Sequence, residues 1–228
     1  MPGVKKPKKE IPDWLRPRAQ GQCDFHTNPT LNRIARTPIW LPWAVYLPII
    51  AVIVGFAIFE IKMNIWSVIA LFLLGWFTWT ITEYIVHRFL YHTETDWEWL
   101  RRIQDRGHGI HHRHPKDPYC LAMPPIFSIF LAAGLFVLFY YLLKDLAFAF
   151  YGGFVFGYLV YLLFHWAQHR LPKRDVPKFL QPLWEHHVIH HYKDPDVNFG
   201  VSTRLWDFLF RTTHEQVYKE EEQRNVNS

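Results

Sequence analysis

Cysteine is scarce in this chain, since only Cys23 and Cys120 occur among its 228 residues. A small domain held together by a framework of disulfides needs several cysteine pairs, so that class is excluded. Intrinsic disorder is excluded by composition, because 50% of the residues are hydrophobic and 18% are aromatic. Disordered chains have low hydrophobicity and few aromatic residues. The chain must therefore bury a large apolar surface.

Charged residues are absent from four long stretches. They are Ile39–Phe59, Met63–Thr82, Leu121–Leu143 and Leu146–Phe164. A helix needs about 20 apolar residues to cross the ~30 Å hydrocarbon core of a bilayer, whereas a buried core helix is shorter and keeps a polar face. The rest of the chain is too short to cover four such helices. The runs therefore predict four transmembrane helices, the third starting at Ile126 after the Pro124-Pro125 break.

Short charged connections at Glu60–Lys62 and Lys144–Asp145 join these runs in pairs, which predicts two hairpins. Of the 25 Lys and Arg residues, only Lys62 and Lys144 lie at the tips, which leaves 25 − 2 = 23 on the other side. The positive-inside bias then places both termini and the 83–123 loop in the cytoplasm. Because the cytoplasm is reducing, we expect no disulfide between the two cysteines.

The first 38 residues are basic and contain no apolar stretch of the kind found in a signal peptide. Their lysines Lys5, Lys6, Lys8 and Lys9 predict a solvated tail near anionic head groups. No nucleic-acid-binding motif accompanies this run, so we expect no nucleic acid partner.

Fourteen histidines are present, and ten of them fall into four spaced groups. The groups are His87 and His92; His108, His111 and His112; His165 and His169; and His187, His190 and His191. We interpret the remaining His26, His114, His186 and His214 as ordinary core or interface residues. A shift in register would let His186 replace His187.

The spacing within the groups suits helices. Residues three and four apart share a helix face, so each H-x-x-H-H triplet, and the pair His165 and His169, can present its rings together. His87 and His92 are five residues apart, which is roughly 140° around an ideal helix. That pair is expected either to be split between two metals or to straddle a distorted helix. Because ten imidazoles exceed what one ion can bind, the pattern predicts two ions with four to five nitrogens each.

The two halves of the chain repeat one order: a hairpin, a histidine pair, a triplet, and then Lys-Asp-Pro at 116–118 and at 193–195. The first histidine of each pair precedes its triplet by a similar span, 108 − 87 = 21 and 187 − 165 = 22. This repetition predicts a pseudo-symmetric site for two metals.

An all-imidazole site suits zinc, iron, copper or nickel rather than magnesium or calcium. Hydrolytic zinc sites hold three protein ligands and a water, and the H-E-x-x-H motif of many zinc proteases is missing. A two-metal site at a membrane edge can instead reach a C–H bond of a lipid. Two irons can activate O2 for such an oxidation, while the protein aims the substrate.

The motifs Glu83–His92 and His108–Pro115, with the closing Gly200–Arg211 stretch, resemble the fatty acid hydroxylase (sterol desaturase) superfamily, and within it the fatty acid 2-hydroxylases. The resemblance covers Pro38 to Thr212. It implies an O2-dependent enzyme with two irons, which zinc can replace in purified relatives, and with the ten grouped histidines as ligands. The implied substrate is the acyl chain of a fatty acid or sphingolipid, hydroxylated at carbon 2.

The implied fold is an all-α integral membrane protein whose four transmembrane helices, in two hairpins, lie under a cytosolic helical cap that holds the metals. We therefore divide the chain into a basic N-terminal segment, 1–38, and a membrane hydroxylase domain, 39–228. Within the domain, the hairpins cover 39–82 and 126–164, and the cap covers 83–123 and 165–228. A bacterial inner membrane and the endoplasmic reticulum are both open, with the site facing the cytoplasm.

Two features depart from the fatty acid 2-hydroxylases. Tyr161-Leu162 stands where they typically have Tyr-Asp, which removes an acidic group next to the third histidine group. The His-Pro-Gly-Gly heme motif of a fused cytochrome b5 is missing from this sequence. We therefore expect electrons from a separate donor, cytochrome b5-like or ferredoxin-like, that docks on the basic face by charge complementarity.

Acidic residues near the histidines are candidates to orient the imidazole rings by hydrogen bonds. Glu83 lies one turn before His87, and Asp117 and Asp194 follow the triplets; Gln168 and Asn198 are weaker candidates. The two aspartates precede prolines, so a role in turn formation is an equal alternative. The aromatic stretch Val201–Arg211 predicts an interfacial helix, or else a lining for the acyl entrance.

Other functions remain open at this stage. A sterol or carotenoid hydroxylase or desaturase belongs to the same superfamily. A metal transporter should place ionisable ligands near the bilayer midplane, but the apolar runs contain no histidine or acid. A b-type heme carrier would need histidine pairs within the membrane, which the runs also lack.

Overall fold

The computed structural model describes residues 10–226. Within this range the regular secondary structure consists of helices, and there are no β-strands. The lysine run predicted to form a solvated tail, Lys5 to Lys9, lies outside the described residues. Four helices are long and apolar enough to cross a membrane, which confirms the predicted fold class. They are α2 (Trp40–Phe59), α3 (Ile65–Ile85) with its continuation η1 (Val86–Tyr91), α6 (Pro125–Leu143) and α7 (Leu146–Arg170).

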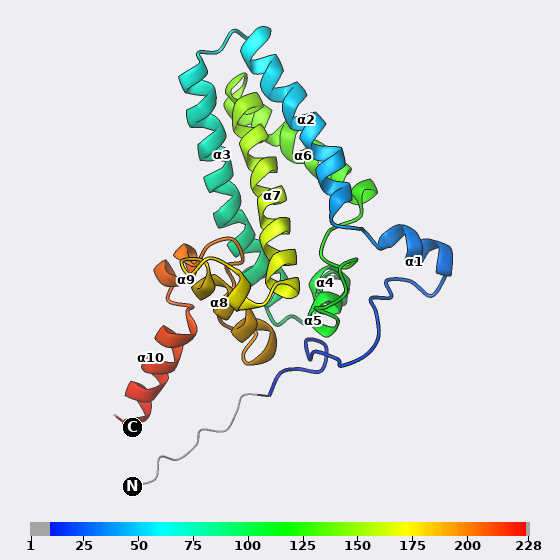
Figure 1. The fold of residues 1–228 in the computed structure, drawn as a ribbon, viewed down its shortest axis with the longest axis vertical. Coiled ribbons are helices and arrows are strands. Elements are labelled where there is room, and N and C mark those ends of the chain that lie inside the picture. Colours follow the sequence, from blue (N-terminus) through cyan, green and yellow to red (C-terminus); the bar gives the residue numbers. More distant parts are fainter. Residues whose placement is uncertain (1–9, 227–228) are drawn as a thin grey trace.

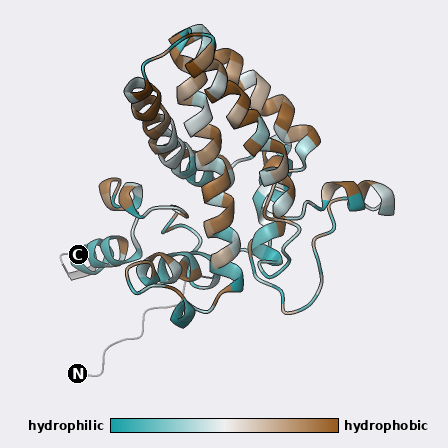
Figure 2. Cartoon of the chain, turned by 45° about the horizontal axis from the view of Figure 1, so that its top comes forward, coloured by the Kyte–Doolittle hydropathy of each residue, from teal (hydrophilic) through white to brown (hydrophobic). Residues whose placement is uncertain are grey.

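The long helices form one end of the molecule, and shorter elements gather at the other end, which we call the cap (Figure 1). Figure 2 shows hydrophobic residues concentrated in the long helices and hydrophilic ones in the cap. The short elements are α1 (Pro29–Ala35), α4 (Glu98–Gln104), η2 (Asp105–Gly109), α5 (Ile110–Arg113), η3 (Lys173–Asp175), α8 (Gln181–Tyr192), α9 (Leu205–Leu209) and α10 (His214–Val226).

Local sequence signals mark where the membrane helices begin and end. Lys62 and Lys144, at the two hairpin tips, adopt left-handed backbone conformations with φ of 57° and 53°, which reverse the chain within a few residues. The Asn64 side chain caps α3 by accepting a hydrogen bond from the Trp66 N–H at 2.9 Å. Pro125 occupies the first turn of α6, where the missing N–H costs nothing.

Helix α7 is the centre of the membrane part, with 61% of its apolar window buried, against 22% or less for the other three. It meets α3 at two glycines. A Cβ on Gly75 would lie 1.9 Å from the Phe150 carbonyl oxygen, and one on Gly153 would lie 1.8 Å from that of Phe72. Small residues let membrane helices approach to backbone contact. One helix of each hairpin is thereby fixed beside the other, which brings the histidine-bearing ends together.

Helix α7 is longer than the apolar run predicts. It continues six residues past Phe164 to Arg170, so His165 and His169 lie in the last turns of a membrane helix. Helix α3 likewise runs on into η1, which has the wide turns of a π-helix. Four of the ten metal-binding candidates, His87, His92, His165 and His169, therefore lie at the cap ends of the two helices that pack most closely.

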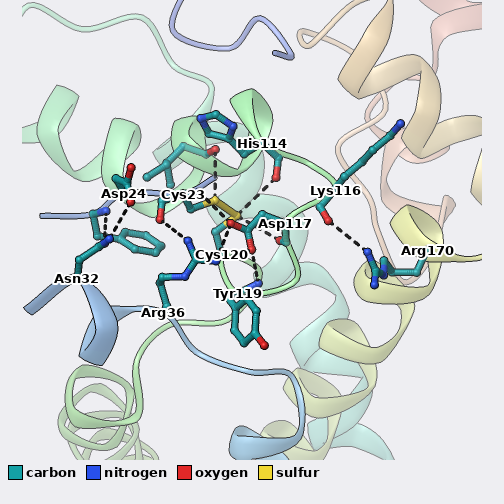
Figure 3. The surroundings of a disulfide bond; sticks show 12 residues. Cys23, Asp24, Asn32, Arg36, His114, Lys116, Asp117, Tyr119, Cys120 and Arg170 are labelled. Carbon is teal, nitrogen blue, oxygen red and sulfur yellow. Dashed lines mark hydrogen bonds and ion pairs between the residues drawn. A yellow bond between two sulfur atoms is a disulfide. The ribbon is translucent and has the colours of Figure 1, made fainter. Parts of the chain in front are cut away.

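The two cysteines form a disulfide, with an S–S distance of 2.09 Å, so the expectation of unpaired thiols is wrong (Figure 3). The expectation rested on the compartment alone and overlooked the path of the N-terminal segment. That segment folds back over the cap, where the Arg18 N–H donates to the Arg113 carbonyl oxygen at 2.8 Å. Cys23 is thereby brought to the loop that contains Cys120, 97 residues later in the chain.

Of the stretch Val201–Arg211, which was predicted to form an interfacial helix, only α9 (Leu205–Leu209) is helical. Its Trp206 faces inward, lies against the Phe77 ring at a tilt with ring centroids 5.4 Å apart, and donates from Nε1 to the Thr80 hydroxyl at 2.9 Å. Phe208 and Leu209 face outward and are exposed. One face thus packs on α3 while the other presents apolar side chains, as a helix at a membrane interface does.

Candidate metal centre

The ten grouped histidines converge into two groups of five, and within each group the ligand atoms lie within 4.8 Å of one another. Group A consists of His87, His92, His108, His112 and His190. Group B consists of His111, His165, His169, His187 and His191. The structure therefore brings together every histidine that the spacing singled out. Both groups lie where the membrane helices α3 and α7 enter the cap.

Each triplet is divided between the two groups. The outer histidines of the first triplet, His108 and His112, belong to group A, whereas His111 belongs to group B. The second triplet mirrors this, since His187 and His191 belong to group B and His190 to group A. Four ligands of each group thus come from one half of the chain and the fifth comes from the other. The two halves complete each other's sites.

The pair His87 and His92 shows what the five-residue spacing means. The segment between them is the π-helix η1, in which residues five apart align. Both rings lie in group A, with centroids 4.9 Å apart. The prediction of a distorted helix is confirmed, and the two rings are not divided between the two groups.

The two groups touch. The rings of His112 in group A and His191 in group B are stacked, with centroids 4.1 Å apart and an interplanar angle of 19°. His111 and His112 are also neighbours in the chain. Any two ions held by these groups would therefore be close neighbours, as chemistry on one small molecule requires.

Several ring nitrogens of the two groups lie close to one another, and others have no hydrogen-bond partner. Within group A, Nε2 of His108 lies 2.8 Å from Nε2 of His87 and 2.9 Å from Nε2 of His112. Within group B, Nε2 of His187 lies 2.8 Å from Nε2 of His169. Both ring nitrogens of His92, His111, His165 and His191 are buried without a hydrogen-bond partner in the described part of the chain. Buried polar atoms are rarely left unpaired, so this donor set fits two bound metal ions.

The electrostatics of the cap favour neutral imidazole. Burial lowers the pKa of His190 from 6.5 to about 3. Burial, followed by the neighbouring rings of His190 and His92, holds the pKa of His112 well below its usual value. The pKa of His191 is lowered by burial and by His112 and His187 in the same way. Neutral imidazole is the form that binds metals, so the groups are in the ligand form at neutral pH.

Two backbone carbonyls after α8 orient rings of group A. The carbonyl oxygen of Val197 accepts a hydrogen bond from Nδ1 of His190 at 2.8 Å, and that of Phe199 accepts one from Nδ1 of His87. A proton held at Nδ1 leaves Nε2 free to bind a metal. The sequence offers no signal for these contacts, because any residue has a carbonyl.

Asp207 holds this carbonyl-bearing loop in place. Its carboxylate accepts N–H bonds from Phe199 at 2.8 Å and Gly200 at 2.6 Å, and it lies 3.0 Å from Nε2 of His186. The Asp207 side chain is fully buried. Sequence reasoning missed this residue, although a lone acid within the apolar stretch Leu205–Phe210 is the signal that could have found it. His186 lies outside both groups and belongs to this network.

The three acidic candidates are hydrogen-bonded to partners other than a histidine ring. Glu83 accepts N–H bonds from Val201 at 2.6 Å and Ser202 at 2.9 Å, anchoring the end of the same loop. Asp117 accepts the Cys23 N–H at 2.9 Å. Asp194 accepts the Asp196 N–H at 3.0 Å.

The other histidines and the two weaker candidates are also placed. His26, His114 and His214 lie outside both groups. Gln168 donates to the Val201 carbonyl oxygen at 3.0 Å, and Asn198 donates to that of His186 at 3.1 Å. Both amides therefore support the loop around the site.

Residues 72–212 match the family model described as fatty acid hydroxylase. The chain belongs to the fatty acid hydroxylase family. The match contains all ten histidines, the Asp207 network and the close contact of α3 with α7.

Relatives in this hydroxylase family come from fungi, plants and animals. The chain is 35% identical over 80% of its length to the ceramide very long chain fatty acid hydroxylase SCS7 of Saccharomyces cerevisiae, and covers 47% of it. It is 34% identical over 76% of its length to the dihydroceramide fatty acyl 2-hydroxylase FAH2 of Arabidopsis thaliana, and covers 70% of it. The fatty acid 2-hydroxylase of Homo sapiens is 37% identical over 62% of the chain, which covers 39% of the human protein.

A solved structure of this family shares the fold. The hydroxylase domain of full-length scs7p superposes with a TM-score of 0.74 at 30% sequence identity, over 89% of this chain and 85% of that one. The chain spans about half of the yeast SCS7 sequence.

Proposed function

We propose that this protein is a membrane monooxygenase that uses O2 to hydroxylate carbon 2 of the acyl chain of a fatty acid or a sphingolipid. The observation that carries the proposal is the pair of buried five-histidine groups at the end of four membrane helices. That position puts the groups beside the acyl chains of a bilayer. Similarity to enzymes named as ceramide hydroxylases and fatty acid 2-hydroxylases supports the substrate class.

The ten histidines are proposed to hold two ions, with iron as the functional metal and zinc as a substitute in purified protein. When bound, two irons supply the activation of O2 that oxidation of an unactivated C–H bond needs. The reaction inserts one oxygen atom into the C–H bond, and the other leaves as water. It consumes two electrons and two protons for each O2.

The protein contributes orientation and a site shielded from water. The Val197 and Phe199 carbonyls fix the rings of His190 and His87. Asp207 and Glu83 fix the loop that carries those carbonyls. Every histidine of both groups except His92 and His169 is buried, which would shield bound metal ions from bulk water.

The remaining proposals concern partners and location. An acidic donor of the cytochrome b5 or ferredoxin kind would supply the electrons. The excess of Lys and Arg on the cap side supports a cytoplasmic site in a bacterial inner membrane or the endoplasmic reticulum. Residues 1–38 would form an N-terminal segment and residues 39–228 the membrane hydroxylase domain.

Expression in a host that lacks 2-hydroxylated lipids tests the function. Mass spectrometry should find acyl chains that have gained one oxygen at carbon 2, and His111→Ala should abolish them. Oxidised sterols or carotenoids with unchanged acyl chains would favour the other branch of the superfamily. Metal uptake by proteoliposomes, without O2 consumption or any oxidised lipid, would contradict an enzyme.

A further inference from the structure

A hollow of about 550 Å³ opens on the cap, between the N-terminal strap (residues 17–22) and the loop that follows α5 (residues 114–119). None of the ten histidines lines it. Its walls include Arg18, Arg36, His114, Lys116, Tyr119 and Tyr192. The lining thus combines cationic and aromatic side chains in a place that the metal groups do not use.

The walls of this hollow are held together by covalent and polar links (Figure 3). The Cys23–Cys120 disulfide joins the strap side to the loop side. The Asp117 carboxylate accepts N–H bonds from Cys23 at 2.9 Å and Tyr119 at 3.0 Å, and pairs with Arg36 at 3.1 Å. The hollow is therefore a built feature whose shape does not depend on a ligand.

The charge of the lining is positive. It contains three cationic side chains, Arg18, Arg36 and Lys116, and one acidic side chain, Asp117, which is paired with Arg36. Arg18 and Lys116 are exposed, and within residues 10–226 neither side chain has an ion-pair partner. Two solvated cations thus remain free to meet an acidic surface, to which unpaired charges contribute both steering and specificity.

The hollow also adjoins the metal centre. Tyr192 in its wall directly follows His191, and their ring centroids are 6.1 Å apart. The His191 ring in turn stacks on His112 of the other group at 4.1 Å. A redox partner seated here would contact Tyr192, which adjoins His191 of one group. His191 touches His112 of the second group, so Tyr192 and one imidazole pair would connect the hollow to both proposed ions.

We propose that this basic hollow docks the acidic face of a one-electron carrier, which delivers in two encounters the two electrons that each hydroxylation consumes. The inference rests on the proposed function and adds the surface at which electrons enter. The strap lies at the end of the molecule opposite the hairpin tips (Figure 1), which favours a soluble partner over a lipid head group. Electron-transfer encounters are weak and bury less than about 1,200 Å², so a small basic hollow is sufficient.

The test measures turnover of the full-length protein in lipid nanodiscs with the soluble heme domain of cytochrome b5 as the acidic carrier. In R18E/K116E, the KM for the carrier should rise roughly tenfold at low salt, and the difference should shrink in high salt, which screens charges beyond a Debye length. The matched control K178E/K219E carries the same charge change at exposed lysines outside the hollow. With dithionite as reductant, both double variants should turn over like the wild type.

The outcomes separate this inference from the proposed function. A wild-type protein that forms no product with either reductant refutes the proposed function. Product formation with an equal carrier KM in R18E/K116E and K178E/K219E overturns the docking surface alone. Binding of inorganic phosphate that R18E/K116E loses, with the carrier KM unchanged, also overturns it and makes the hollow an anion site.

Discussion

The middle histidine of each triplet, His111 or His190, links the two halves of the chain, because it belongs to the group formed mainly by the other half. Spacing alone predicted the ten ring-bearing positions, because pairs and triplets one turn apart recur in both halves of the chain. It did not predict that His111 and His190 cross to the group of the opposite half. Residues i, i+3 and i+4 share a broad helix face, but the side chains at i+3 and i+4 diverge by about 100°. The packing of α5 against α8 therefore decides which group each ring joins.

Replacing a crossed histidine should remove most activity. In His111→Ala or His190→Ala, one group retains four nitrogens and loses the link to the other half. We expect product formation to fall at least about a hundredfold, since changes around a metal centre typically cost 10–100-fold even one layer further out. His26→Ala and His214→Ala are the controls and should retain wild-type turnover. Full turnover by either crossed variant would contradict the ligand assignment.

Sequence reasoning missed Asp207, because a single acid has no spacing partner; its only signal is its position within an apolar stretch. In the structure it satisfies two buried N–H groups and a histidine at once. Such fully satisfied polar networks fix a unique arrangement, and removing one acceptor leaves buried donors unpaired.

Asp207→Asn should therefore weaken both the fold and the metal site. Loss of the charged acceptor should cost about 1–3 kcal/mol of stability, and metal affinity should fall roughly 10–100-fold through the loosened carbonyls of Val197 and Phe199. Thermal unfolding and metal titration measure the two effects. Asp96→Asn changes an exposed acid and serves as control. Unaltered metal affinity in Asp207→Asn would show that the loop does not position the rings.

At the scale of elements, the four membrane helices were predictable because charge-free apolar runs of about 20 residues are typical of transmembrane helices. The π-helical segments η1 and η2 were not, since the five-residue spacing of His87 and His92 left two explanations open. The packing of α3 against α7 could not be predicted from the sequence either. Glycines are common in membrane helices, and only the structure shows that Gly75 and Gly153 meet a neighbouring backbone.

Filling this contact should separate the two histidine-bearing helices. Gly75→Leu or Gly153→Leu cannot fit without moving backbone, so we expect a loss of roughly 3 kcal/mol or more and of bound metal. Gly55→Leu and Gly134→Leu are matched controls, because a Cβ at either position meets nothing within 4 Å. Metal content and thermal unfolding in detergent provide the readouts. Wild-type metal content in both α3–α7 variants would refute the role of this contact.

The buried rings on α5 and α8 also set the response to acid. The pKa of His190 falls from 6.5 to about 3 on folding, so between those values the unfolded chain binds a proton that the folded chain does not. Stability of the metal-free protein should therefore increase as pH rises through this window and decline on acidification. Scanning the unfolding temperature of chelator-treated protein from neutral to mildly acidic pH tests this. An unfolding temperature that rises on acidification would show that the rings gain protons on folding.

For the whole molecule, the disulfide joins Cys23, directly after the N-terminal strap, to Cys120, directly after the loop that follows α5, across 97 residues of sequence. The predicted cytoplasmic location led us to expect free thiols. The sequence gives no sign that the N-terminal segment folds back beside the loop after α5. We expect a thiol-reactive maleimide to label unfolded wild-type protein only after reduction, whereas Cys23→Ser should expose Cys120 without reductant. Two labelled thiols in unreduced wild-type protein would contradict the bond.

The arrangement of the whole molecule depends on two half-chains that each supply four imidazoles to one group and one to the other. Metal analysis of the purified protein by inductively coupled plasma mass spectrometry tests this most directly. The account predicts two ions per chain in the wild type, and reduced occupancy in both His111→Ala and His190→Ala. A saturated wild-type protein with a single ion, or with none, would contradict it.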